Sequence, residues 1–425
     1  MLSKSGAKLP FVTISAKFFR NYFCKNSIKY SGNLRKSHRI CIILHGQAIF
    51  LHKHTENIHI AILSQFPAVC CTFVNQTAAN TSKMKILVTG AAGFIGSKLS
   101  FRLAEAGHAV IGIDNLNDSY DTRLKLARLK WCGIESGTKR FIDGLTRQST
   151  VFPNYSFIRM DISDRGQVTQ LFLNEKFDVA INLAGQSGLT GSIADPYAFI
   201  DSNLVGFMNI LENCRACGVG HLIYASSSSV YGTDYSNPSN ERLRTDSPMS
   251  LNAATKKADE LIAHSYSQLY GLPTTGLRFF TVFGPWSRPD TVSMIFATDI
   301  SRERPCVVFG NENASRDFIY IDDAVEAILH AMKKKPGTDG NGIPFRIYNV
   351  GSSICTKLSG FITLTARMLG KEAKLEYQPA RRGRIVGECA DMSKMESELA
   401  FRPSTELTDG LKQFTDWFTS PLNPL

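Results

Sequence analysis

Three glycines placed between a strand pattern and a helix pattern constrain the fold of this chain more than any other feature. The apolar run Lys85–Thr89 is typical of a short buried strand. Gly90, Gly93 and Gly96 follow it and begin a helical pattern. The first glycine permits a tight turn, the second lets the backbone approach a diphosphate, and the third lets helix and strand pack closely. Because free N–H groups at a helix start attract anions, this spacing predicts a dinucleotide site.

A carboxylate at the end of the next expected strand selects among dinucleotides. Residues 110–113 are that strand, and Asp114 follows them, 18 residues after Gly96. An aspartate in this place accepts hydrogen bonds from both ribose hydroxyls and repels a 2′-phosphate, so NAD is favoured over NADP. Glycine triplets alone also occur in ordinary tight turns, but the triplet with its strand, helix and aspartate is specific for this type of site.

Strand and helix patterns alternate along residues 84–285, which we predict to be an NAD-binding domain. After the first two strands, further strands are expected at residues 156–159, 179–183, 222–225 and 275–278. The helices between them are expected at residues 165–174, 196–217 and 253–270. This alternation predicts an α/β fold, a Rossmann-type doubly wound parallel sheet that binds ligands at the carboxyl ends of its strands.

The alternation weakens after about Gly284, and residues 286–425 are expected to form a smaller α/β lobe that binds the substrate. Its patterns include a short strand at residues 309–310 and helices at residues 322–333, 358–369 and 407–418. We expect segments of the two regions to interleave, so that the cleft between them receives the ligands.

Residues 1–83 differ in charge from the rest of the chain. They hold 11 of the 48 Lys and Arg residues and a single acid, Glu56, whereas the remaining residues carry 37 basic and 36 acidic side chains. The body therefore gives no argument for nucleic-acid binding. Three interpretations of the basic segment are open: an organellar presequence, a weak signal anchor, or upstream sequence that a wrongly assigned start codon includes. Because Met84 stands directly before a complete domain, we expect residues 1–83 to be disordered or absent from the mature protein.

The sequence predicts neither a membrane span nor a metal site. The best candidate for a span, residues 58–74, is interrupted by His59, Gln65 and Pro67, and, like residues 40–44, it lacks a clear helical or strand period. The ten cysteines are scattered, and the Cys214-x-x-Cys217 pair has no partner pair at zinc-like spacing. A disulfide framework is typical of short secreted chains, so we expect a reducing compartment, the cytoplasm.

Several ordered motifs resemble the extended short-chain dehydrogenase/reductase family. Beside the glycine loop they are Gly112-Ile-Asp-Asn-Leu-Asn117, Ser226-Ser-Ser-Ser229-Val-Tyr-Gly232, Arg278-Phe-Phe-Thr-Val-Phe-Gly-Pro-Trp286 and Arg316-Asp-Phe-Ile-Tyr-Ile-Asp-Asp323. Together they resemble the NAD-dependent nucleotide-sugar epimerases and dehydratases, and most closely the UDP-glucuronate 4-epimerases, over residues 84–418. The resemblance implies epimerisation of UDP-glucuronate to UDP-galacturonate through a transient 4-keto sugar.

The resemblance also assigns residues to the cofactor. Phe94 and Ile95 in the glycine loop would lie along the NAD diphosphate, and Lys256 would hold the nicotinamide ribose. The other assigned residues lie near the adenine and its ribose or on the nicotinamide side: Asn115, Asp161, Ile162, Leu183, Ala184, Gly185 and Asn203. For the apolar members of this set, simple core packing is an open alternative.

The expected catalytic group departs from the family pattern at one position. In the family, a tyrosine takes the proton of the sugar 4-hydroxyl, and a lysine four residues later lowers the tyrosine pKa. Here Lys256 matches the lysine, but Asn252 stands at the tyrosine position. Ser227 matches the residue whose hydroxyl bonds the same sugar oxygen. Because an amide cannot accept the proton, we expect impaired turnover.

Four residues match family positions that contact the UDP-sugar. Arg316 and Arg381 match arginines at the UDP phosphates, where the planar guanidinium suits pairs of oxygens. Arg288 matches a position near a sugar carboxylate or a phosphate, and Thr281 matches a polar sugar contact. For Arg288 and Arg381, a solvated surface position is an equal alternative.

Alternatives to UDP-glucuronate epimerisation remain open. Asn252 favours a degenerate homologue that binds NAD and a UDP-sugar without turnover. A UDP-glucose 4-epimerase and a UDP-glucuronate decarboxylase share the same fold and motifs. Relatives often form homodimers through two paired helices, for which residues 196–217 and 253–270 are the candidates.

Overall fold

The computed structural model describes residues 12–14, 39–44, 47–54, 57–63, 83–135, 141–232, 236–380, 383 and 387–425. The chain divides into two compact units, Met1–Thr81 and Ser82–Leu425. In the first unit, antiparallel strands follow the order β1-β4-β3-β2, with β1 Val12–Ile14, β2 Arg39–Leu44, β3 Gln47–His54 and β4 Asn57–Leu63. Residues 40–44 and 58–63 thus lie in strands, although their sequence shows no clear strand period. The absence of residues 1–83 from the mature protein stays a prediction. Among the residues that the structure describes, no helix has the length and apolar character to cross a membrane.

The second unit is built on an eight-stranded sheet, in which all neighbouring strands are parallel except the edge pair β7 and β8. In spatial order the strands are β15 Phe345–Val350, β11 Thr274–Phe279, β10 His221–Ser227, β9 Val179–Asn182, β5 Lys85–Thr89, β6 Ala109–Asp114, β8 Tyr155–Arg159 and β7 Thr146–Gln148. The six expected strands are confirmed, with ends shifted by at most two residues. Strand β15 was not expected, and it comes from the region assigned to the smaller lobe.

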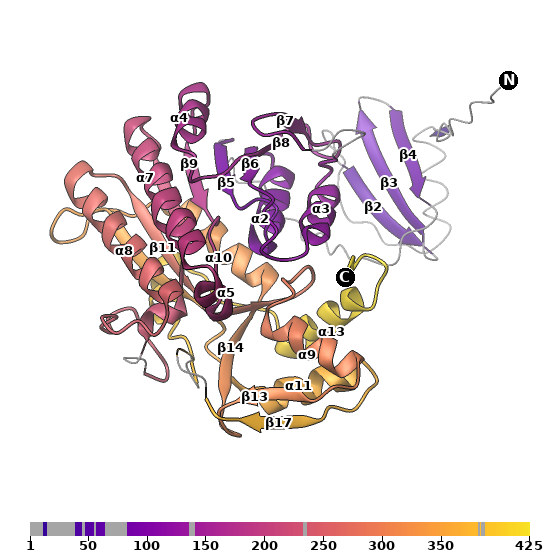
Figure 1. Ribbon diagram of the computed structural model, residues 1–425. Helices are drawn as coiled ribbons and strands as arrows, with labels where there is room; N and C mark the ends of the chain where they lie inside the picture. The colour runs from indigo at the N-terminus through magenta and orange to yellow at the C-terminus, as the bar shows by residue number, and fades with distance from the viewer. Residues whose placement is uncertain are drawn as a thin grey trace. The chain divides into compact units, whose positions relative to one another are not determined.

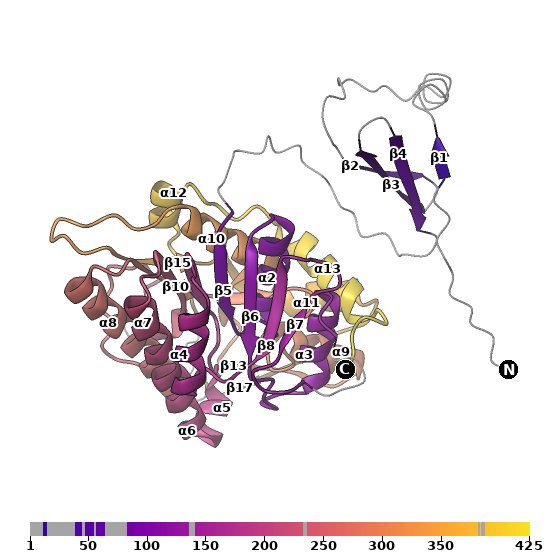
Figure 2. The ribbon, with the colours of Figure 1, turned by 90° about the horizontal axis from the view of Figure 1, so that it is seen from above.

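Strand β5 shows why the central strands are almost wholly apolar. Ile86 and Val88 enter one core with α2 (Phe94–Glu105) and α10 (Ile321–Lys333). The intervening Leu87 enters a second core with α4, α7 and α8. These three helices are Arg165–Asn174, Phe207–Ala216 and Leu251–Tyr270. Figure 2 shows α4, α7 and α8 on one face of the sheet and α2 with α10 on the other. A strand buried on both faces has no polar side, so its sequence is a continuous apolar run.

The expected helix over residues 196–217 is wrong as a single element, because the structure divides it into three pieces. These are α6 Pro196–Phe199, the π-helix η1 Ile200–Gly206 and α7. At Gly206, a Cβ would lie 2.6 Å from Ile162 Cδ1, so the wide turn packs closely against the neighbouring loop. A π-turn changes the residue spacing only locally, which apolar periodicity does not reveal.

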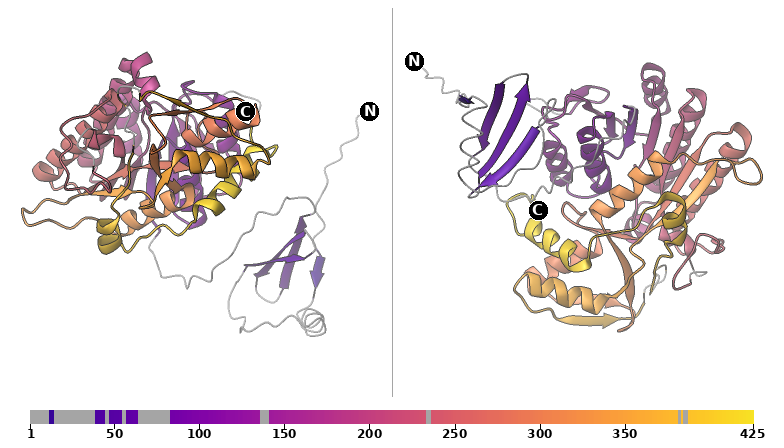
Figure 3. Two further views of the ribbon diagram at one scale, coloured as in Figure 1. Left: turned by 90° about the horizontal axis from the view of Figure 1, so that it is seen from below. Right: turned by 180° about the vertical axis from the view of Figure 1, so that it is seen from behind.

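The smaller lobe gathers below the large sheet in Figure 1 and again in the right panel of Figure 3. It contains two small sheets, β12-β14-β16 and β13-β17. Their strands are β12 Thr281–Phe283, β13 Cys306–Phe309, β14 Ser315–Tyr320, β16 Cys355–Lys357 and β17 Leu375–Gln378. The helices after β12 are α9 Val292–Ser301, α10, α11 Leu358–Met368, α12 Ser393–Leu399 and α13 Leu407–Phe418. Strand β12, which carries Thr281, follows directly from β11 of the large sheet, and it pairs with β14, which carries Arg316.

His221 at the start of β10 makes the stability of the second unit depend on pH. Its Nε2 lies 2.8 Å from Thr275 Oγ1, and its Nδ1 is buried with no partner among the described residues. Burial, helped by the charge of Lys335, lowers the pKa of His221 from 6.5 to about 3. The unfolded chain therefore binds a proton below about pH 6.5 that the folded chain refuses, so stability falls as the pH falls.

We expect wild-type protein to lose about 2 kcal/mol more unfolding free energy between pH 7 and pH 5 than the His221→Gln variant. Urea unfolding of both proteins at the two pH values measures this difference. His108, whose pKa is also lowered by burial, is present in both and cancels. Equal losses in the two proteins would contradict the assignment.

Candidate functional site

The glycine loop between β5 and α2 has no room for side chains. Gly90 has a φ of +69°, and a Cβ there would lie 2.8 Å from Ala184 N. A Cβ at Gly93 or Gly96 would lie 2.8 Å or 2.1 Å from Gly90 O. The loop therefore packs against the end of β9 on one side and against its own helix on the other. All three glycines are required by close backbone approach, as the sequence predicts.

The start of α2 is open to an anionic ligand. Among the described residues, no side chain accepts a hydrogen bond from its first N–H groups. Phe94 is buried and Ile95 is half-buried in the first turn, where apolar contacts fix the helix. Uncapped N–H groups beside a loop without side chains fit the diphosphate of a dinucleotide.

Asp114, the last residue of β6, is buried and held in position by the loops around it. Its carboxylate accepts from Ala92 N at 3.3 Å and from Leu116 N at 2.8 Å. Lys125 Nζ lies 3.4 Å from Asp114 Oδ1, and it also donates to Asn117 Oδ1 at 2.8 Å. The carboxylate is thus held in part by a buried lysine that the sequence analysis missed. Lys125 lies on α3 (Thr122–Trp131), a helix that was also not expected.

The residues expected near the adenine meet at the carboxyl ends of β6 and β8. Asn115 Nδ2 donates to Asp161 Oδ2 at 2.7 Å. Asp161 Oδ1 accepts from the backbone and hydroxyl of Ser163, which together with Asn115 lower the pKa of Asp161 against the effect of burial. Ile162 is buried, with its backbone oxygen held by Asn209 Nδ2 at 2.9 Å. These hydrogen bonds hold the loop after β8 in place, next to the strand end that carries Asp114.

Asn203 fixes the loop that follows β9. This buried amide accepts from Gln186 N at 2.8 Å and donates to Gln186 O and to Thr255 Oγ1 at 3.1 and 3.0 Å. Leu183 and Ala184 precede this loop, and Ala184 N donates to Thr89 Oγ1 at 3.0 Å. The hydrogen bonds of Asn203 thus hold the loop in place and tie it to α8.

Lys256 lies on α8 beside the same loop. A Cβ at Gly185 would lie 3.5 Å from Lys256 Nζ and 2.9 Å from Asn203 Oδ1. Lys256 is buried and pairs with Asp259 one turn later, with Nζ 3.4 Å from Oδ2. Burial raises the pKa of Asp259 to about 7, although the charge of Lys256 opposes this. The lysine thus lies next to the loop after β9 and beside a buried acid that the sequence analysis missed.

Asn252 lies in the first turn of α8, one turn before Lys256. Its Nδ2 donates to Ser229 Oγ at 3.3 Å, and its Oδ1 is buried without a partner among the described residues. Ser229 Oγ in turn donates to Ser227 Oγ at 2.9 Å. The structure therefore links Ser227 to Asn252 through Ser229, and Lys256 lies one turn further along the same helix. Ser229 belongs to the same serine run as Ser227, but its contact with Asn252 could not be predicted from the sequence because the fold brings the two residues together.

A buried ion pair holds α8 against the sheet. Glu260 Oε1 accepts from Ser226 Oγ at 2.6 Å and from Arg278 Nε at 2.8 Å, and Arg278 Nη2 donates to Glu260 Oε2 at 2.8 Å. These bonds join α8 to β10 and β11. Because Asn252 and Lys256 share this helix, the ion pair fixes their height above the strand that carries Ser227.

The expected substrate residues occupy the loops and strands of the smaller lobe. Arg316 on β14 is largely buried and pairs with Glu388 at 3.6 Å. Thr281 begins β12 and pairs in register with Phe318 of β14. Arg288 pairs with Asp290 and donates to Ser187 in the loop after β9. Arg381 lies outside the described residues.

The chain matches the NAD dependent epimerase/dehydratase family over residues 86–351. It is 41% identical to Protein CapI of Staphylococcus aureus over 346 residues, which cover 79% of this chain and 98% of that protein. It is 38% identical to UDP-glucuronate 4-epimerase 3 of Arabidopsis thaliana over 349 residues, covering 80% of this chain and 77% of that protein.

Solved structures show the same similarity. A UDP-glucuronic acid 4-epimerase from Bacillus cereus, in complex with UDP-glucuronic acid and NAD, matches with a TM-score of 0.68 and 30% identity, covering 79% of this chain and 98% of that one. A UDP-glucose 4-epimerase from Thermotoga maritima, with UDP-glucose, matches with a TM-score of 0.65 and 27% identity, covering 79% and 98%. The expected Rossmann-type fold and NAD as cofactor are confirmed.

Proposed function

Because the chain belongs to the NAD dependent epimerase/dehydratase family, we propose that it is a UDP-sugar 4-epimerase that interconverts UDP-glucuronate and UDP-galacturonate, and that Asn252 makes it slow. The similarity to UDP-glucuronate 4-epimerases of a plant and a bacterium supports this substrate. Arg316, on the strand beside the site, supports a substrate that carries a diphosphate.

One observation carries the proposal. Ser227 at the end of β10 is linked through Ser229 to Asn252 on α8, and Lys256, one turn further along α8, lies beside Gly185 in the loop that also packs against the glycine loop. A hydroxyl, an amide and a lysine placed there can bind a sugar hydroxyl next to a dinucleotide. Ligands of doubly wound sheets bind at this edge because the carboxyl ends of the parallel strands meet there.

The side chains divide the work of binding. The glycine loop and the start of α2 would hold the diphosphate of NAD, Asp114 its adenine ribose, and Lys256 its nicotinamide ribose. NAD, when bound, supplies a reversible acceptor for hydride from the sugar C4. Ser227 would donate to or accept from the 4-hydroxyl, and Asn252 Oδ1, which lacks a partner among the described residues, would accept from it. Neither group holds the proton of that hydroxyl, which is the physical reason for slow turnover.

Asn252 also favours a second function, binding of NAD and a UDP-sugar without turnover. The amide leaves every binding contact of the site in place and removes only the base. The two functions predict the same ligand affinity but different rates of product formation. Measuring ligand binding and product formation in the same preparation therefore separates them.

We also propose a homodimer formed through η1, α7 and α8. Tyr197, Val205, Leu261 and Leu269 are exposed apolar side chains on or beside these helices. Apolar side chains gathered on adjoining helices are typical of a protein interface. We also propose that the chain acts in the cytoplasm.

The full chain, incubated with NAD and UDP-glucuronate, is expected to form UDP-galacturonate at a rate about 10²–10⁴-fold below that of an epimerase with an intact base. Chromatography of the nucleotide sugars measures the product, and calorimetry measures NAD and UDP affinity in the same preparation. Binding of both ligands without product would select the second function. Failure to bind either ligand would overturn both.

A further inference from the structure

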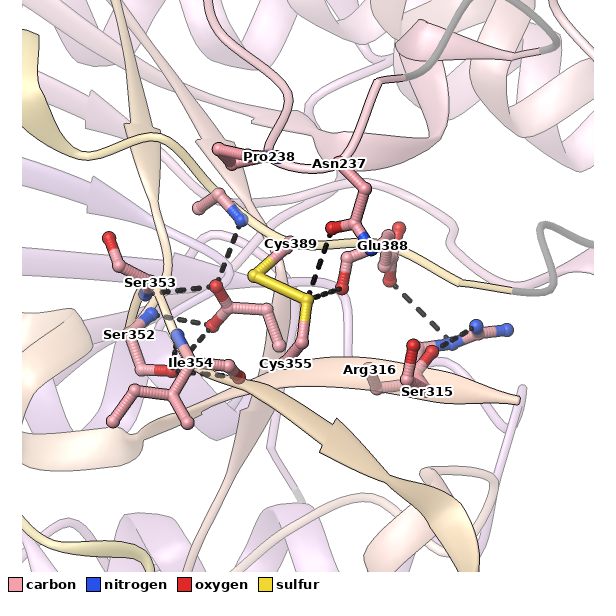
Figure 4. The surroundings of a disulfide bond; sticks show 12 residues. Asn237, Pro238, Ser315, Arg316, Ser352, Ser353, Ile354, Cys355, Glu388 and Cys389 are labelled. Atoms are coloured by element: carbon pink, nitrogen blue, oxygen red, sulfur yellow. Dashed lines mark hydrogen bonds and ion pairs between the residues drawn. A yellow bond between two sulfur atoms is a disulfide. The ribbon is translucent and has the colours of Figure 1, made fainter. Parts of the chain in front are cut away.

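A disulfide joins two cysteines near Arg316, the residue expected to contact the UDP phosphates (Figure 4). Cys355 begins β16 and Cys389 follows Glu388, and their Cα atoms lie 5.3 Å apart. The sequence did not predict this bond, because the two residues are 34 positions apart and are joined only by the fold. Cys355 is exposed to solvent, whereas Cys389 is buried.

The disulfide fixes an acid beside Arg316. Glu388, the neighbour of Cys389, lies with Oε1 3.6 Å from Arg316 Nε, and both side chains are largely buried. Arg316 and Cys355 lie on the adjacent strands β14 and β16. A diphosphate that binds Arg316 must therefore compete with the Glu388 carboxylate for the same guanidinium.

Two further hydrogen bonds hold the segment at Cys389 and Ala390. Cys389 O accepts from Ser239 N at 2.8 Å, and Ala390 N donates to Asp317 Oδ2 at 3.0 Å. These bonds hold the backbone that follows Glu388. Asp317 follows Arg316 on β14, so the Ala390 bond already holds the segment to that strand, and the disulfide adds a covalent tie to β16 at the residue next to Glu388.

We propose that Cys355 and Cys389 form a redox-modified site that controls the affinity of Arg316 for the diphosphate of a nucleotide, an inference that rests on the proposed function. In the oxidised state, the bond holds Glu388 against Arg316 and affinity is low. In the reduced state, Glu388 can leave the guanidinium and affinity is high. The reductant that this site takes is a dithiol.

The chemistry is a thiol–disulfide exchange. One thiolate of the dithiol attacks the exposed Cys355 sulfur, the S–S bond breaks, and Cys389 leaves as a thiolate. The second thiol of the reductant then displaces Cys355 and becomes part of a disulfide itself. Two electrons and two protons pass to the two cysteines. In the reduced state, the Cys355 thiol can donate a hydrogen bond to Asn237 Oδ1, which lies 3.1 Å from its sulfur.

The experiment measures UDP binding by calorimetry on the full chain with NAD present, after treatment with reduced or oxidised dithiothreitol. We expect UDP to bind about three- to tenfold more tightly to the reduced protein, with NAD affinity unchanged. The double variant Cys355→Ser/Cys389→Ser should bind UDP as reduced wild type does, in both conditions. The matched control Cys217→Ser, which removes an exposed free thiol, should keep the response. Glu388→Gln should bind tightly in both conditions.

Several outcomes would overturn the inference. Equal UDP affinity in both redox states refutes it and leaves the proposed function standing. Peptide mapping of oxidised protein that finds no link between Cys355 and Cys389 refutes it as well. A response that persists in the double variant assigns the effect to other cysteines. Absence of UDP binding in both states overturns this inference together with the proposed function.

Discussion

Replacing Asn252 with tyrosine is expected to raise the turnover of UDP-glucuronate by about 10²–10⁴-fold, the usual contribution of a positioned general base. A phenol at this position would stand one helical turn before Lys256 and near Ser229, which now accepts a hydrogen bond from the amide. The charge of Lys256 lowers the pKa of such a phenol, so that a useful fraction becomes phenolate near neutral pH. The backbone needed for this arrangement is already fixed by the Glu260–Arg278 ion pair.

The matched control is Asn252→Phe, which has the ring without the hydroxyl. It is expected to remain as slow as wild type, and all three proteins should bind NAD with equal affinity. Initial rates of UDP-galacturonate formation at several pH values give the comparison. A gain in the phenylalanine variant would show that packing and not proton transfer limits the rate. Ordinary enzyme rates in the wild type would show that another group takes the proton.

The Gly96→Ala variant is expected to lose at least about 3 kcal/mol of unfolding free energy and about 100-fold in NAD affinity. The new Cβ would lie 2.1 Å from Gly90 O and 2.8 Å from Gly90 C, both backbone atoms. Backbone cannot rotate away as a side chain can, so the loop must move as a whole. That movement displaces the N–H groups that we propose bind the diphosphate.

Gly360→Ala is the matched control for this loss. Gly360 lies in the first turn of α11, where a Cβ meets nothing within 4 Å. Alanine there is expected to be neutral or to stabilise the protein by about 0.5–1 kcal/mol. Urea unfolding and NAD calorimetry on both variants provide the test. Wild-type NAD affinity in Gly96→Ala would show that the glycine loop does not bind the diphosphate.

Local sequence predicted the first part of the site well because its geometry is local. A tight turn, a helix start and a strand end within 30 residues leave few arrangements for Gly90 and Asp114. The lysine four residues after Asn252 had to share a helical face with it. The missing tyrosine was visible for the same reason, since a motif fixes the position as well as the residue.

Contacts between distant segments were beyond the sequence analysis. Lys125 at Asp114, Ser229 at Asn252 and Glu388 at Arg316 each join different elements. Their partners depend on the packing of helices and loops, which apolar periodicity does not encode. Strand β15 was missed for the same reason. Its place in the large sheet depends on its pairing with β11, which lies far from it in the sequence.

The sequence by itself determined the doubly wound sheet, the dinucleotide loop and the absence of the expected base, because each depends on spacing within one strand, turn or helix. Only the tertiary structure decided which charges meet: Lys125 at Asp114, Asp259 beside Lys256 and Glu388 beside Arg316. Pairs of this kind form where the fold brings distant segments within a few ångströms, and burial then makes their charges matter.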